Sequence, residues 1–343
     1  MKGRVVLLDQ IGDRPAAALM VDGRLEDLVI DPAGDEAMPG AIYRAVADRP
    51  VKGQGGMFVK LPGGSGFLRQ VGGVAPGQRL LVQVSGPAEP GKAAPVTTRL
   101  LFKSRFAIVT PGAPGLNISR RIRDEDARAA LDVLATAGMA GAAEGLGLIL
   151  RSACEGAAES AVVDDIAAMR GLAEAVLADL TGGPELLVDG ASAHDLAWRD
   201  WLDPAPDEVI EGGFEAQGVI EAIEVLLSPR VDLAGAGHMM VEPTRALVAV
   251  DVNTGADTSP AASLKANVAA ARELPRQLRL RGLGGQVVID FAPIPKRDRH
   301  ILDQVMKAAW KAEGEATLAG WTTLGLFEMT RRRDRLALRD LMA

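Results

Sequence analysis

The sequence contains very little cysteine and few aromatic residues. Cys154 is the only cysteine among 343 residues, which excludes a disulfide framework within the chain and any metal site built from paired cysteines. Aromatic residues make up 3% of the chain, so the core must be packed mainly from Ala, Val, Leu and Ile. An exposed aromatic side chain is therefore unusually informative here. Cys154 itself is expected to be a small buried apolar group without a functional role.

Segments that direct a chain to a membrane are also missing. The first residues show no basic and apolar leader with a small-residue cleavage site, and no apolar run approaches the about 20 residues needed to cross a bilayer. We therefore expect a soluble, cytoplasmic protein with no membrane partner. The length allows two or three domains, since one domain usually takes about 100–200 residues.

The net charge is negative, but basic residues are concentrated in a few stretches. The formal net charge of −7 argues mildly against a polyanionic partner. Basic residues nevertheless outnumber acidic ones between Arg272 and Arg299, in "SRRIR" at 119–123 and in "TRRRDRLALRD" near the end. A fold that brings these stretches together has a basic face. From charge alone, it is an equally good interpretation that the arginines are scattered over the surface, solvated, and form no common basic face.

The pattern of segments changes along the chain. Strand-like segments open the sequence, and Asp22-Gly23 is the turn signal of a hairpin. Short alternating segments separated by Gly and Pro turns fill residues 38–104 and predict a small antiparallel barrel of OB-like size. From 124 to about 180 the chain is mainly helical, interrupted by the strand-like "GLGLILRSA". Beyond 235 the order strand, strand, helix, strand, helix, strand is typical of an α/β unit.

Two aliphatic strands near the end of the chain each finish on an aspartate. "ALVAVD" ends on Asp251, with Asn253 after it, and "QVVID" ends on Asp290; apart from Pro275, residues 260–281 are mostly helix-forming. Strand, helix and strand predict a parallel, right-handed unit, which places both carboxylates at neighbouring carboxyl ends, where α/β sheets bind ligands. Two such carboxylates repel unless a cation lies between them, and oxygen ligands suit Mg²⁺ or Mn²⁺. From these residues alone, the alternative that each aspartate merely caps a turn is about as good.

Several segments occur together in an informative order. The most specific is "RQLRLRGLGGQVVIDF", which lies between "LVAVDVN" and "GLFEMTRRR". Upstream, "GAIYRAV", "MFVKLPGGSGFL", "GKAAPVTT", "PGLNISRRI" and "GLGLILRSA" follow one another. Together they closely resemble the ribonuclease E/G family of bacterial endoribonucleases, and the resemblance covers essentially the whole chain.

The resemblance implies a fold of the α/β class, described more fully as an α+β multidomain fold. Its expected parts are a ribonuclease-H-like subdomain from residues 1–37 and 184–230, an inserted OB-type RNA-binding barrel at 38–104, a helical 5′-sensor region at 105–183, and a catalytic α/β subdomain at 231–343. The implied reaction is the hydrolysis of single-stranded RNA by metal-activated water, leaving a 5′-phosphate. Such an enzyme would act in rRNA maturation or mRNA decay.

The resemblance also implies catalytic residues and a sensor pocket. Asp251 and Asp290 match the two aspartates that hold the catalytic Mg²⁺, with Mn²⁺ as the alternative ion, and Asn253 matches an asparagine that orients the site. Arg151 and Ser152 match the Arg-Thr pair of a pocket that senses a 5′-monophosphate, and an arginine can bind a phosphate in a bidentate manner. Taken alone, Arg151 is more typical of an ordinary surface arginine.

RNA-binding residues of the barrel follow from the same resemblance. Phe58 and Phe67 match an aromatic pair that stacks bases, which contributes about 1–3 kcal/mol per base without sequence preference. Lys92 matches a basic residue near this pair. Taken alone, either phenylalanine is more typical of a core position.

The chain departs from the family pattern beside the predicted metal site. The loop after Asn253 lacks a basic residue and adds Asp257. Pro293 lies near the position where a further acid is expected, and Thr323 occupies the position of an arginine that normally precedes "GLFEM". Fewer cations predict weaker RNA binding, because each phosphate contact adds to affinity through counterion release.

The end of the sequence leads to a further expectation. The chain stops at Ala343 without the cysteine pair that shares zinc between two subunits in the family. We therefore expect no zinc, no zinc-linked dimer, and a monomer or a dimer formed by other contacts.

Three functions stay open from the sequence. The first is an Mg²⁺-dependent endoribonuclease, which the presence of both aspartates and Asn253 favours. The second is an RNA-binding paralogue with weak or no nuclease activity, which the departures at Pro293 and Thr323 and the missing zinc link suggest. The third is an unrelated metal-dependent phosphohydrolase of small molecules, which a failure to bind RNA would favour.

Overall fold

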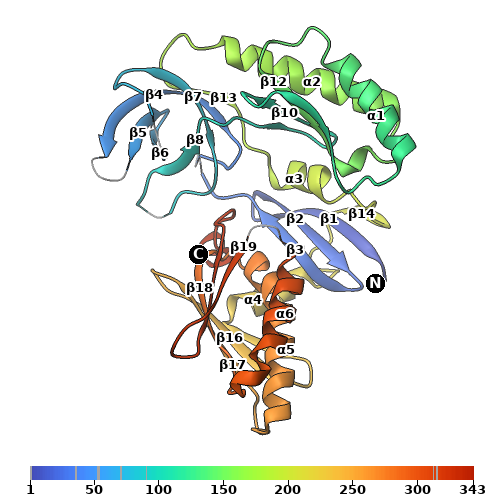
Figure 1. Cartoon of the computed structure of the whole chain (residues 1–343), viewed down its shortest axis with the longest axis vertical. Coiled ribbons are helices and arrows are strands. Elements are labelled where there is room, and N and C mark those ends of the chain that lie inside the picture. Colours follow the sequence, from blue (N-terminus) through green and yellow to red (C-terminus); the bar gives the residue numbers. More distant parts are fainter. Residues whose placement is uncertain are drawn as a thin grey trace. The chain divides into compact units, whose positions relative to one another are not determined.

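The structure is a computed structural model that describes residues 2–34, 37–51, 55–69, 72–89, 91–311, 313 and 316–343. The chain has a mixed α/β fold and divides into two compact units (Figure 1). The barrel unit comprises residues 4–17 and 33–209, and the sheet unit comprises residues 1–3, 18–32 and 210–343. No helix within the described residues is long and apolar enough to cross a membrane.

Five strands of the barrel unit form a closed β-barrel, as the sequence predicts. They are β4 (Ile42–Val51), β5 (Gly56–Leu61), β6 (Gly64–Leu68), β7 (Arg79–Val84) and β8 (Ala94–Thr97). Their order is β4-β5-β6-β8-β7, and pairing of β7 with β4 closes the barrel. The pairing of β6 with β8 is parallel, whereas the pattern predicts only antiparallel neighbours. This difference arises because β7, which lies between them in the chain, pairs with the other edge of β8 and with β4, so β8 returns beside β6 in the same direction. A sixth strand, β13 (Glu185–Val188), adds to β4.

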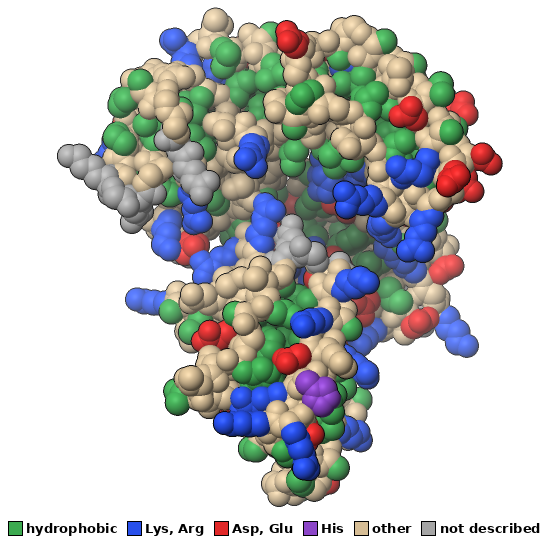
Figure 2. Space-filling model, viewed as in Figure 1, with side chains coloured by type: hydrophobic (Ala, Val, Ile, Leu, Met, Phe, Trp, Pro, Cys, Tyr) green, Lys and Arg blue, Asp and Glu red, His purple; other side chains and the backbone are tan. Residues whose placement is uncertain are grey.

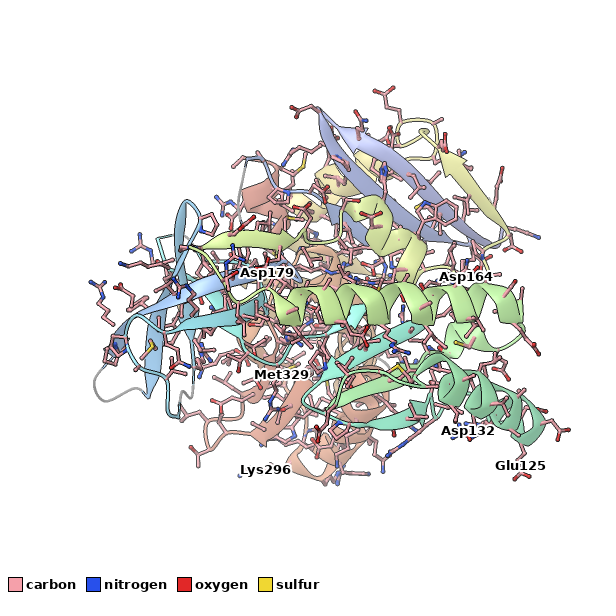
Figure 3. The ribbon with its side chains drawn as sticks, turned by 90° about the horizontal axis from the view of Figure 1, so that it is seen from above. Glu125, Asp132, Asp164, Asp179, Lys296 and Met329 are labelled. Carbon is pink, nitrogen blue, oxygen red and sulfur yellow. The ribbon has the colours of Figure 1, made fainter. Side chains whose placement is uncertain are left out.

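A second sheet in the barrel unit packs against two helices. Its strands, in the order β11-β12-β10-β9, are β9 (Phe102–Lys103), β10 (Ala107–Pro111), β11 (Gly115–Ile118) and β12 (Leu146–Leu150). The helices are α1 (Glu125–Gly138) and α2 (Glu159–Ala178). Leu148 and Leu150 of β12 and Ile166 of α2 are fully buried in their common core. Acidic side chains, among them Glu125 and Asp132 on α1 and Asp164 on α2, point outward (Figure 3).

Local sequence signals account for these elements. Asp124 begins α1 because its carboxylate accepts a hydrogen bond of 2.7 Å from Ala127 N. Gly147 is required in β12, since a Cβ there would lie 2.0 Å from the carbonyl oxygen of Ala113. The unit also contains the short 3-10 turn η1 (Ser152–Cys154) and the helix α3 (Ala193–Asp200). Ser192 caps α3 in a reciprocal capping box with Asp195.

A four-stranded sheet has the order β14-β1-β2-β3. Its strands are β1 (Arg4–Ile11), β2 (Arg14–Val21), β3 (Arg24–Ile30) and β14 (Glu208–Glu211). Asp22 and Gly23 join β2 to β3 with positive φ values of 49° and 77°. The hairpin that the Asp-Gly pair predicts is therefore confirmed, because a two-residue turn of this kind needs positive φ at both positions.

The sheet unit is built on six strands covered by helices on one face. The strand order is β15-β16-β17-β18-β20-β19. The strands are β15 (Arg230–Leu233), β16 (Gly237–Pro243), β17 (Val248–Asn253), β18 (Gly285–Asp290), β19 (Ala316–Trp321) and β20 (Phe327–Arg331). The main helices are α5 (Pro260–Leu280) and α6 (Arg299–Trp310); α4 (Val219–Leu227), η2 (Lys296–Asp298) and α7 (Leu338–Leu341) are shorter. The sequence pattern predicts one strand after α6, but the Gly-containing "TTLGL" segment folds it into the β19–β20 hairpin.

Periodic apolar residues bury α5 and α6 against the sheet (Figure 1). Ala266, Ala270, Leu274 and Leu278 lie one turn apart on α5 and are buried, and Leu302, Met306 and Trp310 repeat the pattern on α6. Ser259 caps α5 through a 3.2 Å bond from Ala262 N, and Pro260 follows at the first helical position. The helix continues through Pro275 without interruption.

Arginines fasten α5 and the C-terminal segment to β3. Arg276 and Arg279 donate to the backbone carbonyl oxygens of Leu25 and Glu26, respectively. Arg335 forms a bidentate ion pair with the buried carboxylate of Asp27. Burial alone would raise the pKa of Asp27, but the charge and hydrogen bonds of Arg335 hold that pKa below its usual value.

Candidate functional site

Asp251 and Asp290 lie side by side on the open face of the six-stranded sheet. β17 and β18 run parallel, with Asp251 opposite Asp290 in register, so the predicted parallel pairing is confirmed. The expectation that the first strand ends on Asp251 is wrong, because β17 continues to Asn253 in its pairing with β16. Val250 and Val252 on β17 are buried on the helix-covered face, whereas Asp251 between them is exposed. Asp290 is likewise exposed at the end of β18. The two-residue period of a strand therefore presents both carboxylates to solvent.

Asn253 orients the carboxylate of Asp251. Its Nδ2 donates a hydrogen bond of 2.7 Å to Asp251 Oδ2, two residues earlier on the same face of β17. His238 on β16 lies opposite Asn253. The amide is a neutral donor, and it bonds one of the two carboxylate oxygens.

Asp257, the acid that this chain adds after Asn253, has a local partner. Ser259 N donates a hydrogen bond of 2.9 Å to Asp257 Oδ1. This bond lowers the pKa of Asp257. Since Ser259 caps α5, Asp257 stabilises the turn that leads into the helix between the two strands.

The donors at this edge fit a hard divalent cation. Mg²⁺ binds oxygen ligands and commonly takes one or two carboxylates while keeping several waters. Within the described residues, no group of three or more His, Cys, Asp or Glu side chains is arranged to hold a metal ion. Asp251 and Asp290 would thus share an ion with water, and their exposure leaves space for that water.

Phe58 and Phe67 point outward from the barrel. They lie directly opposite one another on β5 and β6, and their ring centroids are 5.4 Å apart. Met57 and Val59 on either side of Phe58 are buried, while both phenylalanines are only half-buried. The core position that each residue suggests on its own is therefore not observed. The pair instead presents an aromatic surface to solvent.

Arg49 extends this aromatic surface and was not singled out from the sequence. Its guanidinium carbon lies 5.1 Å from the centroid of the Phe58 ring. A bulge in the β4–β5 pairing between Ala47 and Pro50 brings it there, which no local sequence pattern indicates.

Lys92, the basic residue expected near the aromatic pair, forms an ion pair of 2.5 Å with Glu89.

Arg151 and Ser152 follow β12 and are both engaged by other parts of the barrel unit. Arg151 Nη1 donates to the carbonyl oxygens of Ser104 at 2.7 Å and Arg199 at 3.1 Å, and its Nη2 pairs with Asp200 Oδ1 at 2.6 Å. Ser152 Oγ donates to Asp203 Oδ2 at 2.5 Å. The structure therefore brings the predicted pair together and adds an acidic partner to each member.

Asp200 is shared by three cations. Lys103, Arg151 and Arg199 each form an ion pair with it, at 3.0, 2.6 and 2.9 Å. Burial would raise the pKa of Asp200, but hydrogen bonds and charge from Arg199 and Lys103 outweigh that effect and hold the pKa well below its usual range. With three positive charges around one negative charge, the cluster is cationic.

The sequence comparison with known proteins decides the family. A profile described as the Ribonuclease E/G family matches residues 102–213 and 210–334, more than half of the chain. The chain belongs to the ribonuclease E/G family. The matched range includes Arg151 and Ser152 as well as Asp251, Asn253 and Asp290.

Curated relatives agree with this assignment. The chain is 28% identical over 393 residues to ribonuclease E of Nostoc sp. (strain PCC 7120), a match that covers 97% of this chain and 56% of the relative. It is 27% identical to ribonuclease E of Synechocystis sp. (strain PCC 6803), a match that covers 95% of this chain and 56% of the relative. It is 28% identical to ribonuclease G of Escherichia coli (strain K12), a match that covers 78% of this chain and 62% of the relative. The chain thus spans 56–62% of the length of these three relatives.

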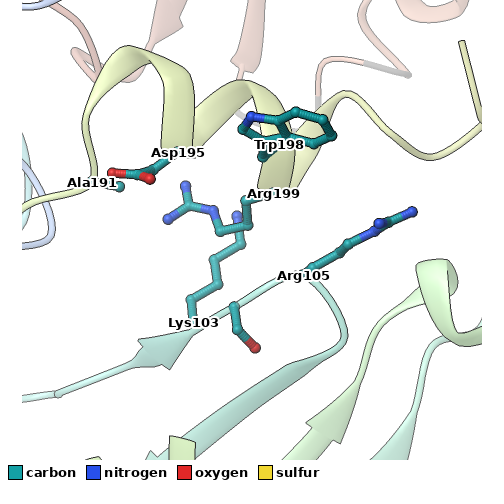
Figure 4. Close-up of a pocket in the computed structure, with 7 residues that line it drawn as sticks. Lys103, Arg105, Ala191, Asp195, Trp198 and Arg199 are labelled. Carbon is teal, nitrogen blue, oxygen red and sulfur yellow. The ribbon is translucent and has the colours of Figure 1, made fainter. Parts of the chain in front are cut away.

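The structure of this ribonuclease E/G family member has a pocket near Asp200 that the sequence did not predict. Its volume is about 280 Å³, and Lys103, Ser104, Arg105, Ala191, Asp195, Trp198 and Arg199 line it. Lys103 reaches from β9 toward Arg199 and Trp198 on α3 (Figure 4). Trp198 is 47% exposed. The available signal was the helical pattern of "HDLAWRDWL", which buries Ala197 and Trp201 and turns the rare aromatic Trp198 outward.

Basic side chains lie on the surface of both units although the chain is acidic overall, with a net charge of −7. Figure 2 shows Lys and Arg side chains on the visible surface of each unit, with Asp and Glu among them.

Proposed function

We propose that the chain is a Mg²⁺-dependent endoribonuclease that cleaves single-stranded RNA and leaves a 5′-phosphate, with Mn²⁺ as an alternative ion. The observation that carries this proposal is the in-register pair of exposed carboxylates, Asp251 and Asp290, with Asn253 bonded to the first. The relatives are named ribonucleases E and G, which supports RNA as the substrate. Processing of rRNA and decay of mRNA are the processes proposed for it.

The residues of the site have distinct proposed roles. Asp251 and Asp290 hold the ion, which when bound supplies a Lewis acid and makes a bound water more acidic at the phosphate. Asn253 holds Asp251 in the orientation that faces Asp290. The open face of β17 and β18 gives an RNA strand access to both carboxylates.

The other parts of the chain are proposed to bind the substrate. Residues 38–104 would form an OB-type RNA-binding domain, supported by the outward-facing Phe58 and Phe67. Residues 105–183 would form the 5′-sensor region. Residues 1–37 with 184–230 would form a ribonuclease-H-like subdomain, and 231–343 the catalytic subdomain.

We further propose that the 5′-monophosphate of the RNA binds at the cationic cluster around Asp200. Lys103, Arg151 and Arg199 outnumber this carboxylate three to one, so a phosphate adds a counter-charge that the cluster lacks. Ser152 lies next to Arg151 and carries a hydroxyl group. A 5′-monophosphorylated RNA should accordingly be cleaved faster than the same RNA with a 5′-hydroxyl.

Cleavage of a short AU-rich, 5′-monophosphorylated RNA in Mg²⁺ or Mn²⁺ tests the proposal. Asp251→Asn and Asp290→Asn should each lower kcat/KM by at least about 100-fold, because a bound ion contributes several kcal/mol at the transition state. Glu242→Gln is the matched control, since Glu242 is exposed on the neighbouring strand β16, opposite Ala249 near the start of β17. Undiminished cleavage by both aspartate variants would refute the metal assignment.

An RNA-binding protein with weak or no nuclease activity is the second candidate. It is favoured by the limited donor set, since no third acidic or histidine ligand joins Asp251 and Asp290 within the described residues. Pro293 and Thr323, where the family pattern has charged residues, favour it as well. RNA binding without turnover of several substrates in Mg²⁺ and Mn²⁺ would support this candidate over the enzyme.

A further inference from the structure

Arg299, the first residue of α6, is held against an aromatic ring at one end of the sheet. Its guanidinium carbon lies 4.5 Å from the centroid of the Trp321 ring. The indole is itself fixed, because Trp321 Nε1 donates a hydrogen bond of 2.8 Å to Asp303 Oδ1, one turn further along α6. The long side chain of Arg299 on α6 is therefore held in one place by the Trp321 ring of β19.

Among the described residues, none with a carboxylate pairs with the guanidinium of Arg299. Within the part of the chain that the structure describes, the Arg299 side chain makes neither an ion pair nor a hydrogen bond, and its Nε is buried without a partner. Arg279 and Arg335 of the same unit are paired with Glu313 and Asp27, respectively. A guanidinium that no carboxylate neutralises keeps its full positive charge and therefore favours an external anion.

Strand register places this guanidinium near the predicted metal site. β18 and β20 are antiparallel, with Ile289 opposite Phe327, so the turn at 322–326 adjoins the strand end that carries Asp290. A Cβ built on Gly325 would lie 3.1 Å from Arg299 Nη2. With antiparallel Cα spacings of about 5 Å and 3.8 Å per residue along the chain, Arg299 reaches to within roughly 10 Å of the Asp290 backbone.

We propose that Arg299 binds a phosphate of the RNA strand next to the bond that is cleaved. The planar guanidinium fork matches two phosphate oxygens. Thr323, two residues before Gly325, is the position where the family pattern has an arginine. Arg299 thus supplies a cation to the same turn from a different element. This inference rests on the proposed nuclease function, because it assumes RNA at Asp251 and Asp290.

Three variants separate a phosphate contact from a purely structural role. Arg299→Gln removes the charge with little change in length, and Arg299→Lys keeps the charge without the fork. Arg245→Gln is the matched control: Arg245 is an exposed arginine of the same unit, in the turn before β17 and away from Asp251. Melting temperatures show whether each variant folds.

RNA binding is measured with the full chain carrying Asp251→Asn, so that no cleavage interferes, using a short single-stranded oligonucleotide at several salt concentrations. Arg299→Gln should weaken binding about 10-fold, the effect of one charged hydrogen bond. It should also reduce the slope of log K against log salt by about 0.7, the value for one lost phosphate contact on a single strand. Arg299→Lys should restore the slope, and Arg245→Gln should leave both quantities unchanged.

The outcomes distinguish this inference from the proposed function. If Arg299→Gln matches Arg245→Gln in affinity and slope while Asp251→Asn alone abolishes cleavage, the inference fails and the nuclease stands. If the wild-type chain cleaves no RNA but Arg299→Gln still reduces affinity and slope, the nuclease fails and the RNA contact stands. A lower melting temperature with no rescue by Arg299→Lys, or no measurable RNA binding by the wild-type chain at low salt, would overturn the inference.

Discussion

Single charged residues in this chain differ mainly in whether a partner neutralises them. Asp251 is bonded by the neutral amide of Asn253, and Arg299 lies against the Trp321 ring. Arg151 pairs with Asp200, a single carboxylate that Lys103 and Arg199 share. Charge that no partner balances attracts ligands of opposite sign, which is why we propose a cation at Asp251 and a phosphate at Arg299 and at the cluster around Asp200.

Cys154 gives a prediction at the residue scale. Burial raises the pKa of this thiol to about 11, so it is protonated at neutral pH and a poor nucleophile. We expect its reaction with a disulfide reagent such as DTNB at pH 8 to be slow in the native protein and fast in urea. The unfolded chain is the control. Equal rates in both states would contradict the prediction.

At the scale of elements, the barrel and the α/β sheet each expose a face that carries residues of the proposed sites. The barrel strands bury alternate side chains and leave Phe58 and Phe67 outside. The sheet buries one face beneath α5 and α6 and leaves the aspartates on the other. Both faces depend on strand register, since a slip of one residue would exchange buried and exposed side chains.

The aromatic face of the barrel leads to a prediction at this scale. Phe58→Ala and Phe67→Ala should each weaken binding of single-stranded RNA by about 1–3 kcal/mol, the contribution of one stacked base. Fluorescence anisotropy with a labelled oligonucleotide measures this change. Val133→Ala, which truncates an exposed apolar residue on α1 of the same unit, is the control. Unchanged affinity in both phenylalanine variants would exclude base stacking at this pair.

At the scale of the whole molecule, buried and partly buried carboxylates make stability depend on pH. Asp27, Asp200 and Glu273 all have pKa values lowered by nearby arginines, lysine or hydrogen bonds despite their burial. A carboxylate whose pKa is lower in the folded state adds stability above its unfolded pKa of about 4, and this contribution is lost as pH falls through the folded pKa. Stability should therefore decrease as pH falls below about 4–5.

Urea unfolding between pH 3 and pH 7 tests this dependence. Asp27→Asn should reduce the free energy of unfolding at pH 7 by about 3–5 kcal/mol, because it leaves Arg335 without its buried partner. The variant should also lose less stability between pH 5 and pH 3 than the wild type. Asp132→Asn removes the same charge from an exposed site on α1 and serves as control. An identical pH dependence in the wild type and Asp27→Asn would contradict this prediction.

The sequence by itself determined the parts that depend on local periodicity and on short motifs. Alternating segments predicted the barrel, Asp22-Gly23 predicted the β2–β3 hairpin, and two strands ending on Asp251 and Asp290 predicted the parallel pair. These features were predictable because side chains alternate every two residues along a strand, and turn residues act over two positions. Pairings between distant segments have no such signal.

Only the tertiary structure decided which distant charges and rings meet. It placed Arg299 on Trp321 and beside Gly325, Arg49 over Phe58, and three cations around Asp200. These contacts join residues on different elements, and their geometry follows from register, a bulge and helix packing. A single charged residue in a sequence does not reveal its partner, because that partner is set by the fold and not by its neighbours along the chain.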